Sequence, residues 1–186
     1  MSSPSAKWSR ATLVLVLYLG LGAAGFAWAR LRGQPNVWRY SGQAEPQVAL
    51  GLLMGLFLGL GFVFVSRLTV HRFEWARALH RDFRARLYPM ATYELLVLAG
   101  ASSLGEEVFF RGSLLPVVGV WGSSLLFALL HIGPRVRYLP WTLSSLLAGL
   151  VFGQLFVWSG DLSGPVLAHF TVNYLNLGHL RDHDLR

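Results

Sequence analysis

The sequence predicts an all-α fold, a polytopic membrane helix bundle with about six membrane segments and its chemically active core in the last four. Of the 186 residues, 54% are hydrophobic and only 13% are charged, whereas soluble domains carry about 25% charged residues. The mean hydropathy is +0.48. The apolar runs are continuous rather than alternating, which favours membrane helices over a transmembrane barrel.

The first two segments are plain membrane spans. Residues 12–29 and 47–66 contain no charged residue, and each approaches the length of about 20 apolar residues that a helix needs to cross a bilayer. Lys7, Arg10 and the Ala-Trp-Ala at 27–29 also resemble parts of a signal peptide. Because the first run is longer than the core of a signal peptide, we expect a retained anchor helix.

The rest of the chain supplies the other four segments, at residues 87–118, 121–132, 141–158 and 164–177. Before them, residues 67–89 mix arginines with apolar side chains, which is typical of an amphipathic helix along the membrane interface. No linker or internal repeat divides the chain. We therefore expect one membrane domain, with two spans in 1–66, a cytoplasmic interfacial segment in 67–87 and the core in 88–178.

Lysine and arginine gather on one side of this predicted topology. If the chain changes side at each segment, twelve basic residues share one side and three the other, namely Arg30, Arg32 and Arg39. Cytoplasmic loops carry the excess of basic residues in membrane proteins, so both termini are predicted to be cytoplasmic, in a bacterial inner membrane. The basic residues flank spans, so the net charge of +7 does not indicate a nucleic-acid partner.

Three charged residues stand inside the third segment: Glu106, Glu107 and Arg111. A charge at the centre of a bilayer costs roughly 2.5–3.5 kcal/mol on insertion scales. Glu107 and Arg111 are four residues apart, so they share a helix face and can pair. Glu106 points about 100° away from Glu107. This leaves Glu106 able to face a cavity.

Polar residues on later segments are candidate partners for Glu106. His131 lies four residues after Phe127, and His169 lies four residues before Asn173. A single membrane histidine often only joins two helices, but polar groups on several membrane helices normally face the bundle interior or a wet cavity. A converging set supplies a base for water and donors for an oxyanion, as a hydrolytic site requires.

Several known kinds of membrane protease do not fit the sequence. The chain has no cysteine, which removes thiolate catalysis and zinc–cysteine sites, and it lacks the zinc-binding HExxH pattern. A GxSG serine site is absent, because the Trp-Ser-Gly at 158–160 lacks the first glycine. A pair of intramembrane aspartates is missing as well, since Asp161 is the only aspartate near a span.

Three short motifs, in order, resemble those of the CAAX protease and bacteriocin-processing family, also called the Abi family. EExxxR is EEVFFR at residues 106–111, FxxxH is FALLH at 127–131, and HxxxN is HFTVN at 169–173. All three lie on predicted membrane helices within 68 residues. The resemblance covers roughly residues 88–178 and leaves out the first two spans.

The resemblance implies a glutamic-type intramembrane endopeptidase that cleaves near the C-terminus of its substrate. It implies that Glu106 and His131 position and deprotonate the attacking water, and that His169 and Asn173 stabilise the oxyanion. The residues expected to support the site are Glu107, Arg111 and Phe127. A zinc ion held by Glu106, His131 and His169 is an alternative, since His₂Glu with an open position is a known catalytic arrangement. We favour the site without metal.

The resemblance also implies a membrane-anchored protein or peptide substrate, whose C-terminal tail can carry a lipid. The compact chain is similar to small bacterial members that process C-terminal sorting tails, such as the myxosortase group. The predicted topology puts Glu106 and His169 in the outer half of the membrane, which suits the tail of an exported protein. Two other interpretations stay open. One is a non-catalytic bacteriocin-immunity or scaffold protein of the same fold, and the other is a small transporter, although transporters of that sort usually show repeated halves.

Overall fold

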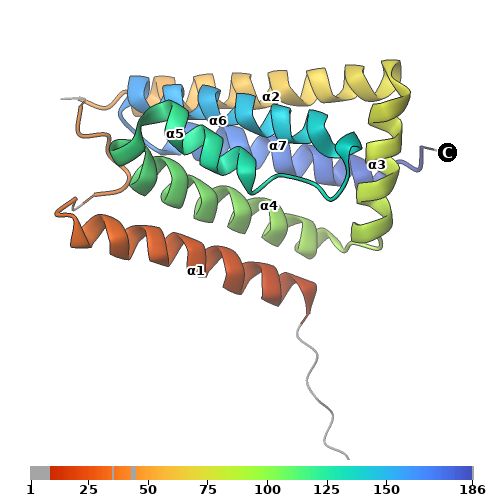
Figure 1. Ribbon diagram of the computed structural model, residues 1–186, viewed down its shortest axis with the longest axis horizontal. Coiled ribbons are helices and arrows are strands. Elements are labelled where there is room, and N and C mark those ends of the chain that lie inside the picture. Colours follow the sequence, from red (N-terminus) through yellow and green to blue (C-terminus); the bar gives the residue numbers. More distant parts are fainter. Residues whose placement is uncertain (1–8, 35, 43–44, 186) are drawn as a thin grey trace, which may run out of the picture.

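The computed structural model describes residues 9–34, 36–42 and 45–185, and it confirms the all-α prediction (Figure 1). The only β-structure in these residues is an isolated bridge between Arg39 and Asp161. The elements are α1 (Arg10–Leu31), α2 (Val48–Arg72), α3 (Glu74–Leu87), α4 (Thr92–Glu107), the π-helix η1 (Val108–Leu114), α5 (Leu115–Leu129), the 3₁₀-helix η2 (Val136–Tyr138), α6 (Leu139–Ser159) and α7 (Ser163–Asp182). Lys7 and Arg186, two of the basic residues predicted to be cytoplasmic, lie outside the described residues.

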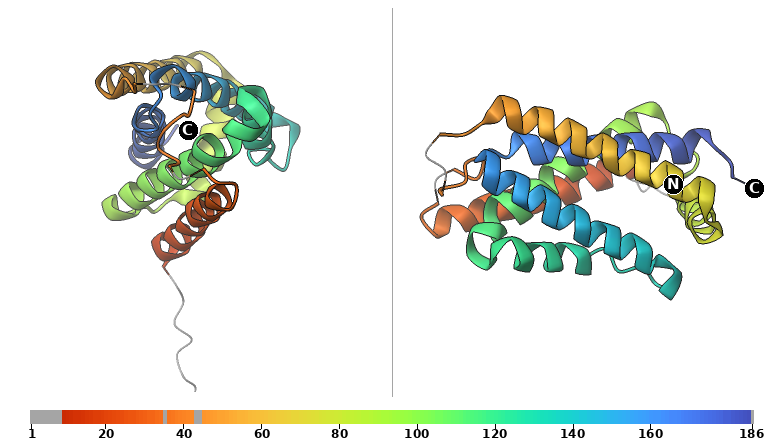
Figure 2. Two further views of the ribbon diagram at one scale, coloured as in Figure 1. Left: turned by 90° about the vertical axis from the view of Figure 1, so that its left-hand side faces the viewer. Right: turned by 90° about the horizontal axis from the view of Figure 1, so that it is seen from above.

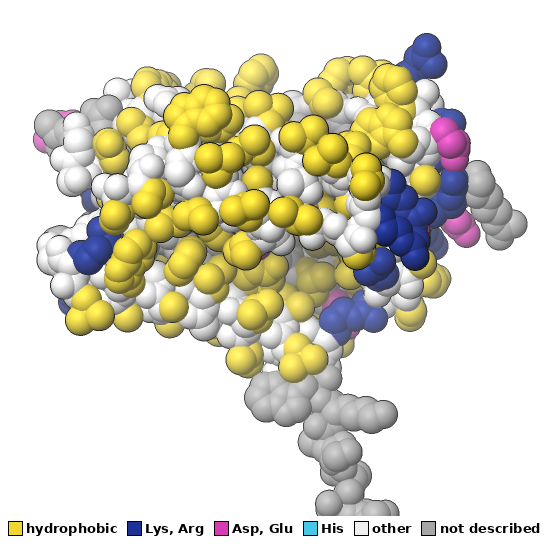
Figure 3. Space-filling view, in the orientation of Figure 1, with side chains coloured by type: hydrophobic (Ala, Val, Ile, Leu, Met, Phe, Trp, Pro, Cys, Tyr) yellow, Lys and Arg dark blue, Asp and Glu magenta, His cyan; other side chains and the backbone are white. Residues whose placement is uncertain are grey.

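Four helical stretches are long and apolar enough to cross a membrane: Arg10–Leu31, Val48–Arg72, Thr92–Leu129 and Val136–Ser159. They expose large apolar side chains such as Leu17, Phe57 and Leu129, and apolar side chains spread over the face seen in Figure 3. So much exposed apolar surface would be a liability in water, but it matches the hydrocarbon of a bilayer. The chain is therefore a helical membrane protein.

The stretch Thr92–Leu129 folds back at Gly119 and so contains two of the six predicted segments. Gly119 has φ 73° and ψ 175°, a backbone conformation that residues with a Cβ rarely adopt. After this break, α5 runs back toward α3 (Figure 1). The reversal falls between residues 118 and 121, where the sequence placed the boundary. The last predicted segment is α7, which is 20 residues long but more polar than the four spans.

A stripe of glycines on α2 holds α7 close. Gly51, Gly55 and Gly59 are four residues apart, so they share one face of α2. A Cβ at Gly55 would lie 2.2 Å from the backbone oxygen of Gly164, and one at Gly59 would lie 2.9 Å from that of Ala168. The absence of side chains here lets the two backbones touch, as at other small-residue contacts between membrane helices. Packing on α2 therefore positions α7, the helix that carries His169 and Asn173.

The helix α3 crosses one end of the bundle at a steep angle to the other helices (Figure 1). It begins at Glu74, not at residue 67, because the apolar run of α2 continues as helix to Arg72 and ends at the extended residue Phe73. The boundary predicted at 67 is thus corrected. The arginines at 67 and 72 extend the last turns of α2, where basic side chains interact favourably with the carbonyl end of a helix.

Basic side chains at this end satisfy carbonyl groups at the end of α7. Arg67 donates to Oδ1 of Asn176 at 2.7 Å and to the carbonyl of Leu175 at 2.8 Å. Arg84 donates to the carbonyls of Leu180 and Arg181. The carbonyls of Leu180 and Arg181 are among the last four of α7, which have no intrahelical donor. Together with the contacts of Arg67, these hydrogen bonds fasten α7 to α2 and α3. Figure 3 shows arginines gathered at this end.

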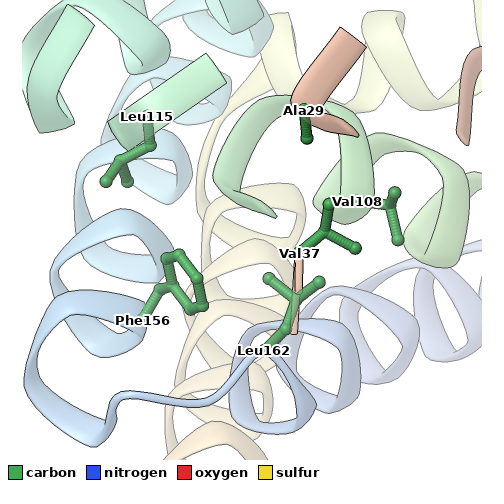
Figure 4. Close-up of a cluster of buried hydrophobic side chains, with 6 residues drawn as sticks. All are labelled: Ala29, Val37, Val108, Leu115, Phe156 and Leu162. Carbon is green, nitrogen blue, oxygen red and sulfur yellow. The ribbon is translucent and has the colours of Figure 1, made fainter. Parts of the chain in front are cut away.

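The opposite end of the bundle is closed by a small core of buried apolar side chains (Figure 4), namely Ala29, Val37, Val108, Leu115, Phe156 and Leu162. Two backbone hydrogen bonds tie the loop after α1 to the turn between α6 and α7. Tyr40 N donates to Gly160 O at 3.1 Å, and Leu162 N donates to Trp38 O at 3.0 Å. The end-on view in Figure 2 shows α1 beside α4 and away from α2. This core fixes α1 against η1 and the end of α4.

Candidate active site

Glu107 and Arg111 form a buried ion pair. Nη1 of Arg111 lies 2.9 Å from Oε1 of Glu107, and the exposed fractions of the two side chains are 1% and 0%. The guanidinium carbon lies 4.5 Å from the ring centre of Phe127 and 5.9 Å from that of Phe152, so aromatic rings cover the cation. The predicted pairing of these two residues at i, i+4 is confirmed.

Arg111 lies in the π-helix η1, and two carbonyl groups of this helix accept hydrogen bonds from side chains outside it. Pro116 has no N–H, so the carbonyl of Gly112 lacks the donor that an α-helix would supply. Nε2 of Gln34 donates to this carbonyl at 2.9 Å, and Nη2 of Arg32 donates to the carbonyl of Ser113 at 2.6 Å. Side chains that follow α1 thus stabilise η1. π-Helical turns are frequent at functional sites.

His169 on α7 lies between the two glutamates. Its Nδ1 is 2.8 Å from Oε1 of Glu107, and its Nε2 is 3.6 Å from Oε2 of Glu106. An ionised carboxylate only accepts hydrogen bonds, so Nδ1 carries a proton and donates to Glu107. Nε2 therefore faces Glu106, beyond direct hydrogen-bond distance. The sequence paired Glu107 with Arg111 alone, whereas the structure gives it His169 as a second partner.

Asn173 lies one helical turn after His169 and faces the same stretch of α4. Its Nδ2 donates to Oγ of Ser102 at 2.9 Å, and Ser102 is one turn before Glu106. The two cross-helix contacts are therefore about 5.4 Å apart along the helices. A side-chain amide has two N–H groups, so Asn173 keeps one N–H beyond its bond to Ser102.

His131 follows α5 and is held by its own helix and by aromatic rings. Its Nδ1 lies 2.8 Å from the carbonyl of Phe127, so Nδ1 donates and Nε2 keeps its lone pair. The ring centre of His131 lies 4.4 Å from that of Phe127 and 5.2 Å from that of Trp141. His131 interacts electrostatically with Glu106 and His169. Within the described residues it makes no direct hydrogen bond to either.

Three buried polar atoms of this cluster have no hydrogen-bond partner among the described residues: Oε2 of Glu106, Oε2 of Glu107 and Nη2 of Arg111. Buried polar atoms are usually paired, because leaving one unpaired costs about 1–3 kcal/mol. An unpaired carboxylate oxygen that faces an imidazole indicates a place for a polar ligand, such as a water molecule or a peptide group.

Among the described residues, no group of three His, Asp or Glu side chains is placed to hold a metal ion. Glu106 and His169 lie close together, while the ring of His131 is held against Phe127. The site therefore brings together Glu106, Glu107, Arg111 and His169 directly. Asn173 and His131 flank this group.

Sequence reasoning missed several residues that build the site. Ser102 could have been found, because it lies four residues before Glu106 and so on the same face of α4. Phe152 is one of many apolar residues on its helix, and nothing local marks it. The roles of Arg32 and Gln34 could not be predicted, because both side chains bind a helix about 80 residues further along the chain.

The fold and this cluster define a helical membrane protein with an ionisable centre shared by α4, η1 and α7. Residues 88–175 match the family model described as "Type II CAAX prenyl endopeptidase Rce1-like", so this region of the chain is similar to that family. The resemblance carried by the three motifs is thereby confirmed.

A relative from Bacillus subtilis (strain 168), called "Uncharacterized protein YpbD", is 36% identical over 94 residues. The alignment covers 49% of this chain and 46% of that protein, so the chain spans about half the length of this curated relative. No solved structure matches the chain.

Proposed function

We propose that this protein is a glutamic-type intramembrane endopeptidase that works without a metal ion. The placement of Glu106 carries the proposal. Its carboxylate is buried, its Oε2 has no partner among the described residues, and that atom lies 3.6 Å from Nε2 of His169. A carboxylate placed beside imidazoles can serve as a general base for water. The family matched by residues 88–175 is named for peptide hydrolysis.

In the proposed reaction, Glu106 and His131 hold the attacking water. Nε2 of His131 keeps its lone pair, because Nδ1 donates to Phe127, so it can accept a hydrogen bond from this water. Glu106 takes one proton as the water oxygen bonds to the scissile carbonyl carbon. When the C–N bond breaks, the same proton passes from Glu106 to the leaving amine nitrogen, and the carboxylate is restored.

His169 and Asn173 are proposed to stabilise the oxyanion of the tetrahedral intermediate. Asn173 has an N–H beyond its bond to Ser102. His169 donates through Nε2 when its ring carries both protons, and the carboxylate of Glu107, fixed by Arg111, stabilises that cationic ring. Removing one such donor typically lowers kcat by about 10²–10³.

We propose a membrane-anchored protein cut near its C-terminus as the substrate. Glu106 lies about 21 Å along α4 from Thr92, at 1.5 Å per residue. His169 lies only about 9 Å from the first residue of α7. Both are nearer the end of the bundle opposite α3, and the distribution of basic residues predicts that this end faces the outside. This depth suits the membrane tail of an exported protein.

The test compares C-terminal peptides of membrane proteins by mass spectrometry in three strains. One carries the wild-type protein, one carries Glu106→Gln, and one lacks the protein. We expect the Glu106→Gln strain to accumulate the same uncleaved tails as the strain without the protein, although the variant reaches wild-type abundance. The exposed Glu74→Gln serves as the control and should process normally.

Normal processing by Glu106→Gln would remove this residue as the base. Identical C-termini in the wild-type and deletion strains would favour the immunity or scaffold interpretation over a protease. Cleavage by the purified protein should persist in a chelator. Loss of cleavage that zinc restores would overturn the metal-free mechanism.

A further inference from the structure

The first helix lies unusually close to the site, because small residues line the contact between α1 and α4–η1. A Cβ at Gly25 would lie 2.9 Å from Cα of Phe109. A Cβ at Gly105 would lie 2.3 Å from the backbone oxygen of Tyr18. Backbones that approach this closely cannot accommodate a side chain between them. The contact therefore brings Tyr18 next to Gly105, the residue that precedes Glu106.

Tyr18 is half-buried on a helix whose other faces are mostly exposed. It lies about 12 Å along α1 from Arg10, inside the span rather than in an interfacial belt of aromatic residues. A tyrosine hydroxyl at such a depth needs a polar partner. The hydroxyl of Tyr18 lies within electrostatic reach of the carboxylate of Glu106, the residue that follows Gly105.

We propose that Tyr18 is a positioning residue that orients the Glu106 carboxylate, and that α1 thereby completes the active site. This inference rests on the proposed function. His169 faces Glu106 from α7 and His131 approaches from α5, while Glu107 is its neighbour on α4. We take the hydroxyl of Tyr18 to donate a hydrogen bond to this carboxylate from a further helix, α1.

The region that matches the family model therefore does not contain every residue of the proposed active site. Tyr18 lies outside residues 88–175, the region that matches the Rce1-like model. Arg32 and Gln34, which cap the carbonyls of η1, also lie outside it. The N-terminal span thus contributes to the chemistry through Tyr18 and to the shape of the site through the residues that follow α1.

A stability measurement tests the contact without any substrate. Thermal unfolding of the detergent-solubilised full chain is compared for wild type, Tyr18→Phe, Glu106→Leu and the double variant. Tyr18→Phe keeps the packing on Gly105 and removes only the hydroxyl. We expect it to lower the melting temperature in the wild-type background but not in the Glu106→Leu background, because the two residues interact. Equal effects of Tyr18→Phe in both backgrounds would overturn the proposal.

A kinetic measurement tests the role. Pulse-chase labelling follows the removal of the C-terminal tails identified above, in cells with wild type, Tyr18→Phe or the control Tyr93→Phe, whose ring is 59% exposed on α4. We expect Tyr18→Phe to slow processing roughly tenfold or more at wild-type abundance, as for loss of a hydrogen bond to a charged group. The control should process at the wild-type rate. An unchanged rate in Tyr18→Phe would also overturn the proposal.

The two failures can be told apart. If Glu106→Gln processes tails normally, or if no tails depend on the protein, the proposed function fails and the stability comparison alone decides whether Tyr18 contacts Glu106. If Glu106→Gln is inactive while Tyr18→Phe behaves as wild type in both measurements, only the role of Tyr18 fails. Slowed processing together with coupled stabilities supports the inference.

Discussion

At the scale of single residues, the buried pair of Glu107 and Arg111 should matter most for stability. Replacing Glu107 with alanine leaves the Arg111 cation buried without its partner, which typically costs about 3–5 kcal/mol. The exposed pairs of Glu74 with Arg77 and Arg81 should contribute little, because solvent screens them. We therefore expect Glu107→Ala to lower the yield and melting temperature of the folded protein far more than Glu74→Ala, as measured by thermal unfolding in detergent.

A compensating double variant checks this reason. Glu107→Leu combined with Arg111→Met removes both charges and keeps apolar volume, so it should recover much of the lost stability. A melting temperature for Glu107→Ala that matches Glu74→Ala would contradict the ion pair. A double variant as unstable as Glu107→Ala would indicate that the packing of these side chains, rather than their charge, is what the protein needs.

The sequence could predict this pair because the two residues lie four apart on one helix. It could not predict that His169 joins the same carboxylate, since the two residues are 62 positions apart and on different helices. The role of Tyr18 could not be predicted for the same reason. The polar residues of a buried site can be identified from composition, whereas their partners depend on how the helices pack.

At the scale of helices, the glycine stripe of α2 should control the position of α7. In Gly55→Ala the new Cβ would lie 2.2 Å from the backbone oxygen of Gly164, so the two helices must separate. We expect a loss of about 1–3 kcal/mol in the free energy of unfolding, as for other overpacked sites, together with reduced tail processing, because α7 carries His169. Denaturation and pulse-chase assays on the same variant measure both effects.

Gly61→Ala is the matched control on the same helix, because nothing lies within 4 Å of a Cβ there. Alanine has the higher helix propensity, so this variant should be as stable as wild type or slightly more stable. Equal behaviour of the two variants would show that α2 and α7 are not in close contact at Gly55.

The sequence predicted the helical segments well, because apolar runs are local signals. It did not predict the π-helix η1. That element depends on Pro116, which removes one helical donor, and on Arg32 and Gln34, which donate to its carbonyls from a distant loop. The start of the amphipathic helix was also misplaced, since basic residues alone do not end an apolar helix such as α2.

At the scale of the whole molecule, the bundle has one strongly basic end. The arginines of α3 lie there, and the loop after α5 joins them, because Arg137 lies 2.5 Å from Asp82 and the hydroxyl of Tyr138 donates to the same carboxylate at 3.1 Å. The end of α7 is held there as well, through Arg84. This arrangement agrees with the predicted topology, in which the chain changes side at each segment and most basic residues share one side.

This asymmetry predicts that the basic end faces the cytoplasm. The chain has no cysteine, so single cysteines report their own side of the membrane. Ser41→Cys, in the loop between α1 and α2, should react with a membrane-impermeant maleimide added to intact spheroplasts. Phe73→Cys, between α2 and α3, should react only after the membrane is opened. The reverse pattern would invert the topology and place the active site nearer the cytoplasm, which would favour a cytosolic lipidated tail over the tail of an exported protein.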